Sequence, residues 1–223
     1  MKNIFPLFIL FIMTTATIAC KKDSDAPEAE IKEPVEAKKV PAASQKYLVD
    51  VVASTIDWAG SKPTGRHTGT IKLTDGQVFV KDSILETGKF TIDMKSITVT
   101  DLKDAEQKQN LENHLKGLKT EAADHFFNTN KFPTGIFEIT GTTRENDRSM
   151  VEGNLTLKGI TKNIKFPAVI TITDNAVTLV SDSFKINRTL WNINYSSKTV
   201  FENLGNEYVS DDIELKINMR ATK

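Results

Sequence analysis

The sequence predicts an all-β domain of eight to nine antiparallel strands with one helical excursion at about 101–127. From Tyr47 onward, apolar and polar residues alternate with a period of two in many short segments, as in half-buried strands. Residues 101–119 break this pattern, because their leucines recur at helical spacing, and Asp101 is the expected helix cap. Strands with one apolar face each close most economically into a barrel or a sandwich.

The alternation is clearest in the last segment, where Ile213, Leu215 and Ile217 share one face and charged or polar residues take the other. Turn residues such as Asp75-Gly76 and Asp174-Asn175 separate the segments. The expected strands lie at 47–58, 68–74, 77–85, 89–95, 136–143, 148–157, 164–173, 176–187 and 209–220. The apolar faces are rich in Phe, Ile, Leu and Val, so the interior is expected to be oily, whether filled by side chains or hollow.

Composition excludes several classes of protein. The 29 basic and 29 acidic residues balance, whereas nucleic-acid binding requires a basic surface. The single cysteine, Cys20, precedes the domain, so the core alone must hold the fold together without a disulfide. No hydrolase or phosphate-loop motif occurs, and we expect no enzyme. The three histidines lack the short spacing typical of metal ligands, and we expect no metal site.

The first residues have the layout of a secretory signal peptide. Lys2 precedes an apolar run at 4–13 that is too short to span a bilayer, which takes about 20 residues. Thr17-Ile18-Ala19 then leads to Cys20, a stretch similar to the lipobox of bacterial lipoproteins except that Thr17 stands where Leu is usual. This predicts a signal peptide at 1–19 and acylation of Cys20. The alternative is ordinary secretion, with Cys20 removed or left as a free thiol.

Residues 20–46 are expected to form the lipidated cysteine and a disordered linker. Residues 21–46 contain no aromatic residue, three prolines, six acidic residues and six lysines. Such a segment buries too little apolar surface to offset the entropy of ordering it. As a flexible chain it would reach roughly 25–30 Å and would tether the domain at 47–223 to a membrane. A mere spacer is the alternative.

Several short motifs occur in a defined order along the domain. The motifs are His67-Thr68-Gly69, residues 90–97, His114-Leu115-Lys116, residues 124–127, residues 153–162, residues 184–191 and Asp211. Their order and spacing strongly resemble the YceI-like family over about 47–221. Two small departures are Asn128, where that family often has Asp, and Asn163, where it commonly has Pro. The resemblance implies a lipocalin-like barrel whose cavity holds a polyisoprenoid chain, such as an isoprenoid quinone or a prenyl pyrophosphate.

Candidate lipid-binding residues follow from this resemblance and from the aromatic composition. Core packing accounts for most aromatic residues, so we expect about a third of them to contact a ligand. Asp211 falls on an apolar face, and we expect a structural ion pair with Arg188 or Lys158. The candidates are Trp58, His67, Phe90, His114, Phe126, Phe127, Phe137, Phe184, Arg188 and Trp191.

The function expected from the sequence is that of an envelope lipoprotein that carries or stores an isoprenoid lipid. No cofactor is expected apart from a bound quinone or polyprenyl phosphate, and the partners are that lipid and a membrane. Lys21 after Cys20 favours the outer membrane facing the periplasm, with display at the cell surface as the other side. Oligomeric state stays open. The alternative function is a non-enzymatic envelope stress or interaction module with a side-chain-filled barrel.

Overall fold

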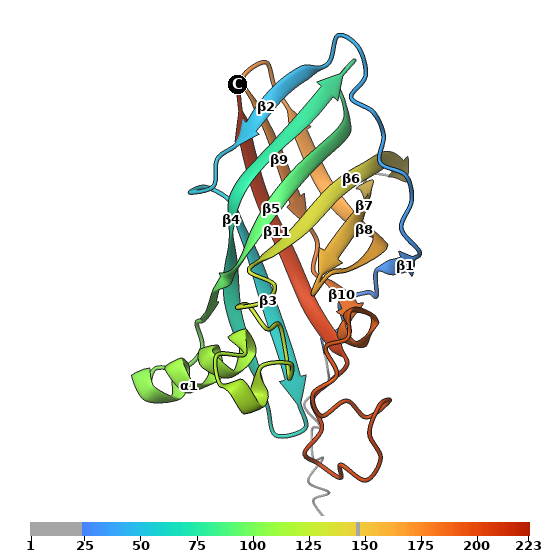
Figure 1. The fold of residues 1–223 in the computed structure, drawn as a ribbon. Helices are drawn as coiled ribbons and strands as arrows, with labels where there is room; N and C mark the ends of the chain where they lie inside the picture. Colours follow the sequence, from blue (N-terminus) through green and yellow to red (C-terminus); the bar gives the residue numbers. More distant parts are fainter. Residues whose placement is uncertain (1–23, 146–147) are drawn as a thin grey trace, which may run out of the picture.

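The described part of the chain folds into an antiparallel sheet that closes into a ring, with one α-helix at one end (Figure 1). This computed structural model describes residues 24–145 and 148–223. The expected signal peptide at 1–19 and the acylation site Cys20 lie outside the described residues.

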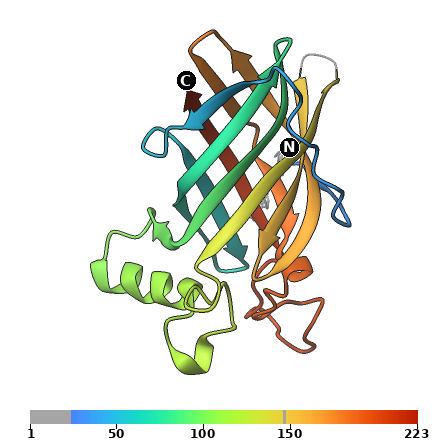
Figure 2. The same ribbon diagram turned by 45° about the horizontal axis from the view of Figure 1, so that its top comes forward.

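The strands follow one another around the ring in nearly sequential order. Antiparallel pairs run β4 to β5, β6, β7, β8 and β9, and β11 closes the ring by pairing with β9 and with β2 and β3. β2 and β3 share one position, and so do β9 and β10, so the ring has the size expected from the sequence (Figure 2). The elements are β1 (Glu30–Lys32), β2 (Gln45–Val49), β3 (Thr55–Lys62), β4 (Gly65–Lys81), β5 (Ile84–Val99), α1 (Ala105–Lys116), η1 (Thr120–Ala122), β6 (Thr134–Glu145), β7 (Arg148–Leu157), β8 (Ile160–Ile172), β9 (Ala176–Ser181), β10 (Phe184–Asn187), η2 (Arg188–Trp191) and β11 (Asp212–Thr222).

The turn expected at Asp75-Gly76 is wrong, because β4 continues through it as one 17-residue strand. The register against β5 shifts between Leu73 and Asp75, which marks a β-bulge rather than a turn. Gly76 lies inside the strand, where a Cβ atom would come within 2.7 Å of the Val49 side chain. The actual turn follows at Asp82-Ser83, where both residues have positive φ.

Two expected strands are each divided in the structure. The segment 47–58 separates into β2 and β3 at 50–54, and the segment 176–187 separates into β9 and β10 at Asp182-Ser183. Both breaks occur where β11 changes partner around the ring. The closing of the sheet into a ring causes these breaks. The local alternation of apolar and polar residues does not reveal it.

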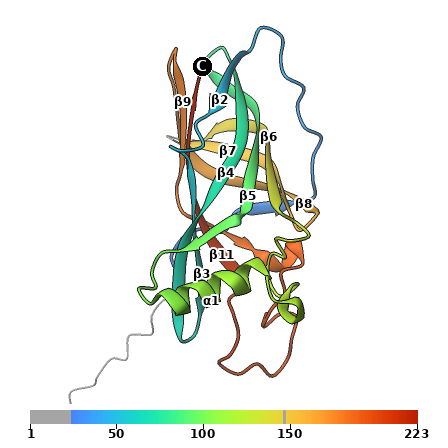
Figure 3. The same cartoon turned by 60° about the vertical axis from the view of Figure 1, so that its left-hand side comes forward.

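The helical excursion is confirmed, but its cap is Asp104 rather than Asp101. The Asp104 carboxylate accepts a hydrogen bond from the N–H of Gln107 at 2.8 Å, and Gly117 ends the helix with φ 68°. Asp101 instead accepts hydrogen bonds from the β4 residues His67 and Thr68. The helix lies across the end of the ring at which the β3–β4 hairpin turns (Figure 3).

The linker expected to be disordered is partly ordered, and part of it joins the wall of the barrel. We call residues 27–40 the strap. Its strand β1 pairs antiparallel with β8 over Glu30–Lys32, and Glu28 bridges to Lys185 of β10. β9 pairs with β8 only from Ala168 onward, so β1 fills the gap that remains between β8 and β10. Backbone groups along this open gap explain why a segment of linker composition becomes ordered.

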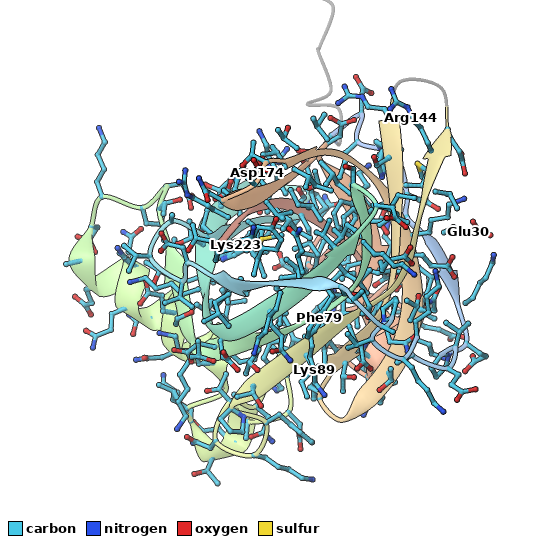
Figure 4. All side chains as sticks on the ribbon, turned by 90° about the horizontal axis from the view of Figure 1, so that it is seen from above. Glu30, Phe79, Lys89, Arg144, Asp174 and Lys223 are labelled. Atoms are coloured by element: carbon cyan, nitrogen blue, oxygen red, sulfur yellow. The ribbon has the colours of Figure 1, made fainter. Side chains whose placement is uncertain are left out.

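The two ends of the barrel differ. At the end away from α1, tightly packed side chains fill the ring, and Figure 4 looks into this end beside Asp174 and Lys223. In the same view, β1 with Glu30 lies at the outer margin of the ring. The filling residues are Tyr47, Val78, Val80, Leu85, Ile139, Val151 and Val177.

Candidate functional site

A cavity of about 330 Å³ occupies the half of the barrel nearest α1. It extends from Met219 and Leu179 in the middle of the ring to the tip of the β3–β4 hairpin. The exposed Lys62 at that tip belongs to its lining, so the cavity reaches the surface at the α1 end. Its volume is at the lower end of the range typical of small-molecule sites. The side-chain-filled barrel of the alternative function therefore does not describe this half.

A row of aromatic rings forms part of the cavity wall. Phe90 and Phe137 lie 6.2 Å apart between ring centres, and Phe137 lies 5.9 Å from Phe166. Phe166 stacks on Phe184 at 4.3 Å with an angle of 6° between the ring planes. The four rings come from β5, β6, β8 and β10, so the row joins strands that are distant in sequence.

Nine of the ten residues proposed from the sequence line the cavity. The exception is Trp191, which is fully buried in the wall and does not belong to the lining. Its indole N–H donates a hydrogen bond to the carbonyl of Leu155 at 3.0 Å. Trp191 is therefore not a contact residue of the cavity, because its side chain is packed inside the wall. The nine are Trp58, His67, Phe90, His114, Phe126, Phe127, Phe137, Phe184 and Arg188.

Four rings form a cluster at the open end of the cavity, which we call the mouth cluster: His114, His125, Phe126 and Tyr195. The imidazoles of His114 and His125 lie 3.0 Å apart from Nε2 to Nδ1, a hydrogen bond with one ring as donor and the other as acceptor. Tyr195 stacks on His125 at 4.4 Å and meets His114 edge-on at 4.8 Å. The cluster thereby joins α1 to the loop at 192–211 across the mouth.

Burial lowers the pKa of His114, and repulsion from His125 and Lys119 adds to this effect. The neutral form of His114 is therefore favoured in the folded protein. A neutral His114 can share one proton with His125, whereas two imidazolium rings would repel each other at 3.0 Å.

Arg188 is buried behind the mouth cluster and anchors the loop at 192–211. Its Nη2 lies 3.6 Å from the Asp211 carboxylate, which confirms the expected pair, while Lys158 lies near Asp124 instead. Burial lowers the pKa of Arg188, although Asp211 opposes this effect. The guanidinium donates to four backbone carbonyls, those of Ile193, Tyr195, Val209 and Ser210. Four of its five N–H groups thus donate to the backbone of this loop, so its role is to hold the loop.

His67 lines the mouth from the opposite side. Its Nδ1 lies 2.9 Å from Asp101, which also accepts the N–H of Thr68. Partial burial raises the pKa of Asp101, but these hydrogen bonds outweigh it and the pKa is lowered overall. The carboxylate thus fixes the orientation of the His67 ring at the rim of the cavity.

Comparison with known proteins assigns the barrel to a protein family. The family model of the YceI-like domain matches residues 47–221. The chain belongs to the YceI-like family. A UPF0312 protein of Pseudomonas aeruginosa is 33% identical over 82 residues, which cover 36% of this chain and 43% of that protein. The alignment thus spans less than half the length of this curated relative.

Solved structures share this YceI-like fold at low sequence identity. Burkholderia cenocepacia BcnA superposes with a TM-score of 0.60 at 20% identity, over 78% of this chain and 99% of BcnA. A polyisoprenoid binding domain from Saccharophagus degradans, implicated in plant cell wall breakdown, gives a TM-score of 0.55 at 13% identity, over 79% and 97% of the two chains. These similarities support the lipocalin-like barrel with one helix.

Most of the lining of this YceI-like barrel is aliphatic and was not singled out from the sequence. Ile213, Leu215, Ile217 and Met219 of β11 all line the cavity. Their alternation was visible, but alternation marks the inward face without separating the hollow half from the filled half. Helix residues Leu111 and Leu115 also reach the lining, because α1 covers the open end.

The cavity offers an apolar interior with a few polar groups at its mouth. Within residues 24–145 and 148–223, no group of three or more His, Cys, Asp or Glu side chains is arranged to hold a metal ion. Among the helices of those same residues, none is long and apolar enough to cross a membrane. The arrangement suits a mostly apolar ligand with a small polar end.

Proposed function

We propose that this chain is an exported lipoprotein of the bacterial envelope that binds an isoprenoid lipid in its cavity, as carrier or store. The observation that carries the proposal is the apolar cavity. Side chains close the barrel at one end, and the cavity reaches the surface at the other. The similarity in fold to a domain described as polyisoprenoid binding supports the same ligand class. The proposal assigns no catalytic step.

The ligand is of quinone or polyprenyl type, with its chain toward the aromatic row and its head group at the mouth. Arg188 is unsuited to hold a head group, because four of its N–H groups already donate to backbone carbonyls and its charge is paired with that of Asp211. Other polar side chains in the lining include those of Lys62 and His67, together with those of Ser61, Ser210 and Asp212. A head group at the mouth would lie near these residues.

Transfer between the cavity and a bilayer would be nearly balanced. Burying a methylene stabilises it by about 0.8 kcal/mol relative to water, and a bilayer offers almost the same gain. Shape and head-group contacts must therefore decide whether the cavity is occupied. A free isoprenoid chain in water is strongly unfavourable, so exchange requires a membrane close to the mouth, which acylation of Cys20 would provide. We propose the outer membrane, on its periplasmic side.

The test is mass spectrometry of the organic extract of protein purified from a native, membrane-containing host. Met94 lines the cavity and is buried, so Met94→Trp should fill it and remove the co-purifying isoprenoid. Val169→Trp adds the same ring on the exposed outer face of β8 and should keep the ligand. Both variants need a thermal unfolding curve to show that they fold. Absence of isoprenoid from the wild-type extract, with no binding of added quinone, would refute the proposal.

A further inference from the structure

The N-terminal end of the described chain lies beside the mouth of the cavity. Ser24 shares a small surface pocket with Ser61, Ser210 and Asp212, three residues that also line the large cavity. The hydroxyl of Ser24 also hydrogen-bonds the carboxylate of Glu214. The chain therefore enters the barrel at the same end at which the cavity reaches the surface.

Much of the expected tether is not free to extend. From Pro27 to Lys32, the strap is held by backbone hydrogen bonds to Lys185 and by its pairing with β8. Farther along, Val35 is held by Asn154. Only three residues, Lys21 to Asp23, separate the acylation site Cys20 from Ser24 on the barrel. The four residue-to-residue steps from Cys20 to Ser24 span at most about 14 Å, in contrast to the roughly 25–30 Å reach of a fully flexible linker.

Exposed apolar side chains lie on the segments that surround the mouth. Val200 and Phe201 are adjacent in the loop at 192–211 and are 45% and 49% exposed. Leu190 of η2 and Leu118 just after α1 are also exposed, and both of these segments lie at the same end as the loop (Figures 1 and 3). Single exposed apolar residues are ordinary, but adjacent ones beside a cavity mouth and a lipid anchor fit an interfacial contact.

We propose that the α1 end of the barrel docks on the surface of the membrane that holds acylated Cys20, with the cavity mouth facing the lipid. This inference rests on the proposed function, because it requires the acyl anchor. The domain would then be oriented at the membrane instead of moving freely, because Ser24, beside the mouth, lies within about 14 Å of Cys20.

The contact is apolar rather than electrostatic. In the loops at 117–125 and 192–211, acidic residues outnumber lysines: Glu121, Asp124, Glu202 and Glu207 against Lys119 and Lys198, with Asp211 paired internally. Anionic lipid is therefore not expected to strengthen docking, since attraction to anionic headgroups requires clustered basic residues.

The test measures how close a fluorophore lies to the lipid headgroups when it is attached at either of two matched positions. It uses the acylated full chain on vesicles of phosphatidylethanolamine and phosphatidylglycerol. Once Cys20 is acylated, a fluorophore can be placed on Phe201→Cys or on Ile84→Cys, because the domain has no other cysteine. The two positions are 49% and 50% exposed, and Ile84 is the first residue of β5, across the turn from the far end of the 17-residue strand β4. A quencher bound to lipid headgroups should remove the fluorescence of the Phe201 label and leave that of the Ile84 label.

Equal quenching of the two labels, or quenching of neither, would overturn the docking. A flexible Gly-Ser insertion between Asp23 and Ser24 should weaken quenching at Phe201, and an unchanged signal would overturn the role of the short link. Replacing phosphatidylglycerol by phosphatidylcholine should leave the Phe201 signal unchanged. A signal that needs the anionic lipid would contradict an apolar contact.

The same samples separate this inference from the proposed function. Isoprenoid in the organic extract together with equal quenching would overturn only the docking. Selective quenching at Phe201 without any isoprenoid would overturn only the ligand. An intact mass without acyl chains would overturn the anchor and the docking together.

Discussion

The side chain of Asn154 holds the backbone of Val35 as a neighbouring strand would. Its Oδ1 accepts the N–H of Val35 at 3.1 Å, and its Nδ2 donates to the carbonyl of the same residue at 2.7 Å. Asn163 supports Asn154 by donating to its Oδ1 at 3.2 Å. One amide on β7 thus fixes a strap residue 119 positions earlier in the chain.

Asn154→Ala should release the strap without unfolding the barrel. The two hydrogen bonds to the strap are lost together with the one from Asn163, each with a net stabilisation of about 0.5–1.5 kcal/mol. Amide hydrogen exchange at 30–38 should become faster, while exchange in β4 and β5 stays slow. Asn110→Ala, at an exposed position on α1, is the matched control and should leave strap exchange unchanged. Unchanged exchange in Asn154→Ala would show that the amide does not hold the strap.

Arg188→Met should destabilise the protein strongly. It leaves Asp211 without its buried partner and four carbonyls without donors, and breaking such a pair costs about 3–5 kcal/mol. Arg188→Lys should recover little of this loss, because one ammonium cannot replace the planar guanidinium. Chemical denaturation provides the free energy of unfolding.

Arg148 is the matched control, since it pairs with Asp182 at the exposed surface at 3.4 Å. Arg148→Met should cost less than about 1 kcal/mol. Similar losses for Arg148→Met and Arg188→Met would contradict the anchoring role of Arg188.

Acidification should weaken the mouth cluster through His114. Its folded pKa lies below the ordinary value of about 6.5, so the unfolded chain binds the proton more readily. The stability contributed by neutral His114 is fully present above the unfolded pKa and is lost as pH falls from there toward the lowered folded pKa. Between about pH 7.5 and 5.5, most carboxylates stay ionised and do not obscure the effect.

The measurement compares unfolding free energies of wild type and His114→Gln over that pH range. Glutamine keeps a polar side chain beside His125 but does not titrate. The variant should lose less stability than wild type on acidification. If the unfolding free energy depended on pH with the same slope in both proteins, His114 would be excluded as the source of the loss of stability in acid.

Ligand binding should change the fluorescence of Trp58 and not that of Trp191. Trp58 lines the cavity, whereas Trp191 is buried outside the lining. Trp58→Phe should therefore abolish the fluorescence response to an added short-chain quinone while the Trp191 emission remains. The substitution should fold well, because the Trp58 N–H is buried without a hydrogen-bond partner among the described residues. A response that persists in Trp58→Phe would place the quinone outside the cavity.

By itself, the sequence determined the barrel, the inward faces of its strands, the helical excursion and the family. These depend on local periodicity and on motifs in order, and both are written along the chain, as the alternation of β11 shows. The Arg188–Asp211 pair was also foreseeable, because a carboxylate on an apolar face requires a partner.

Only the tertiary structure decided which half of the barrel is hollow and where the strap lies. Filling depends on the summed volumes of side chains that face one another across the ring, so Val78 and Leu215 look alike in sequence but lie in the filled and the hollow half. β1 has no local strand signal in its three residues, because its stabilisation comes from the backbone edges of β8 and β10. The physical reason in both cases is that the deciding contacts join residues far apart in the chain.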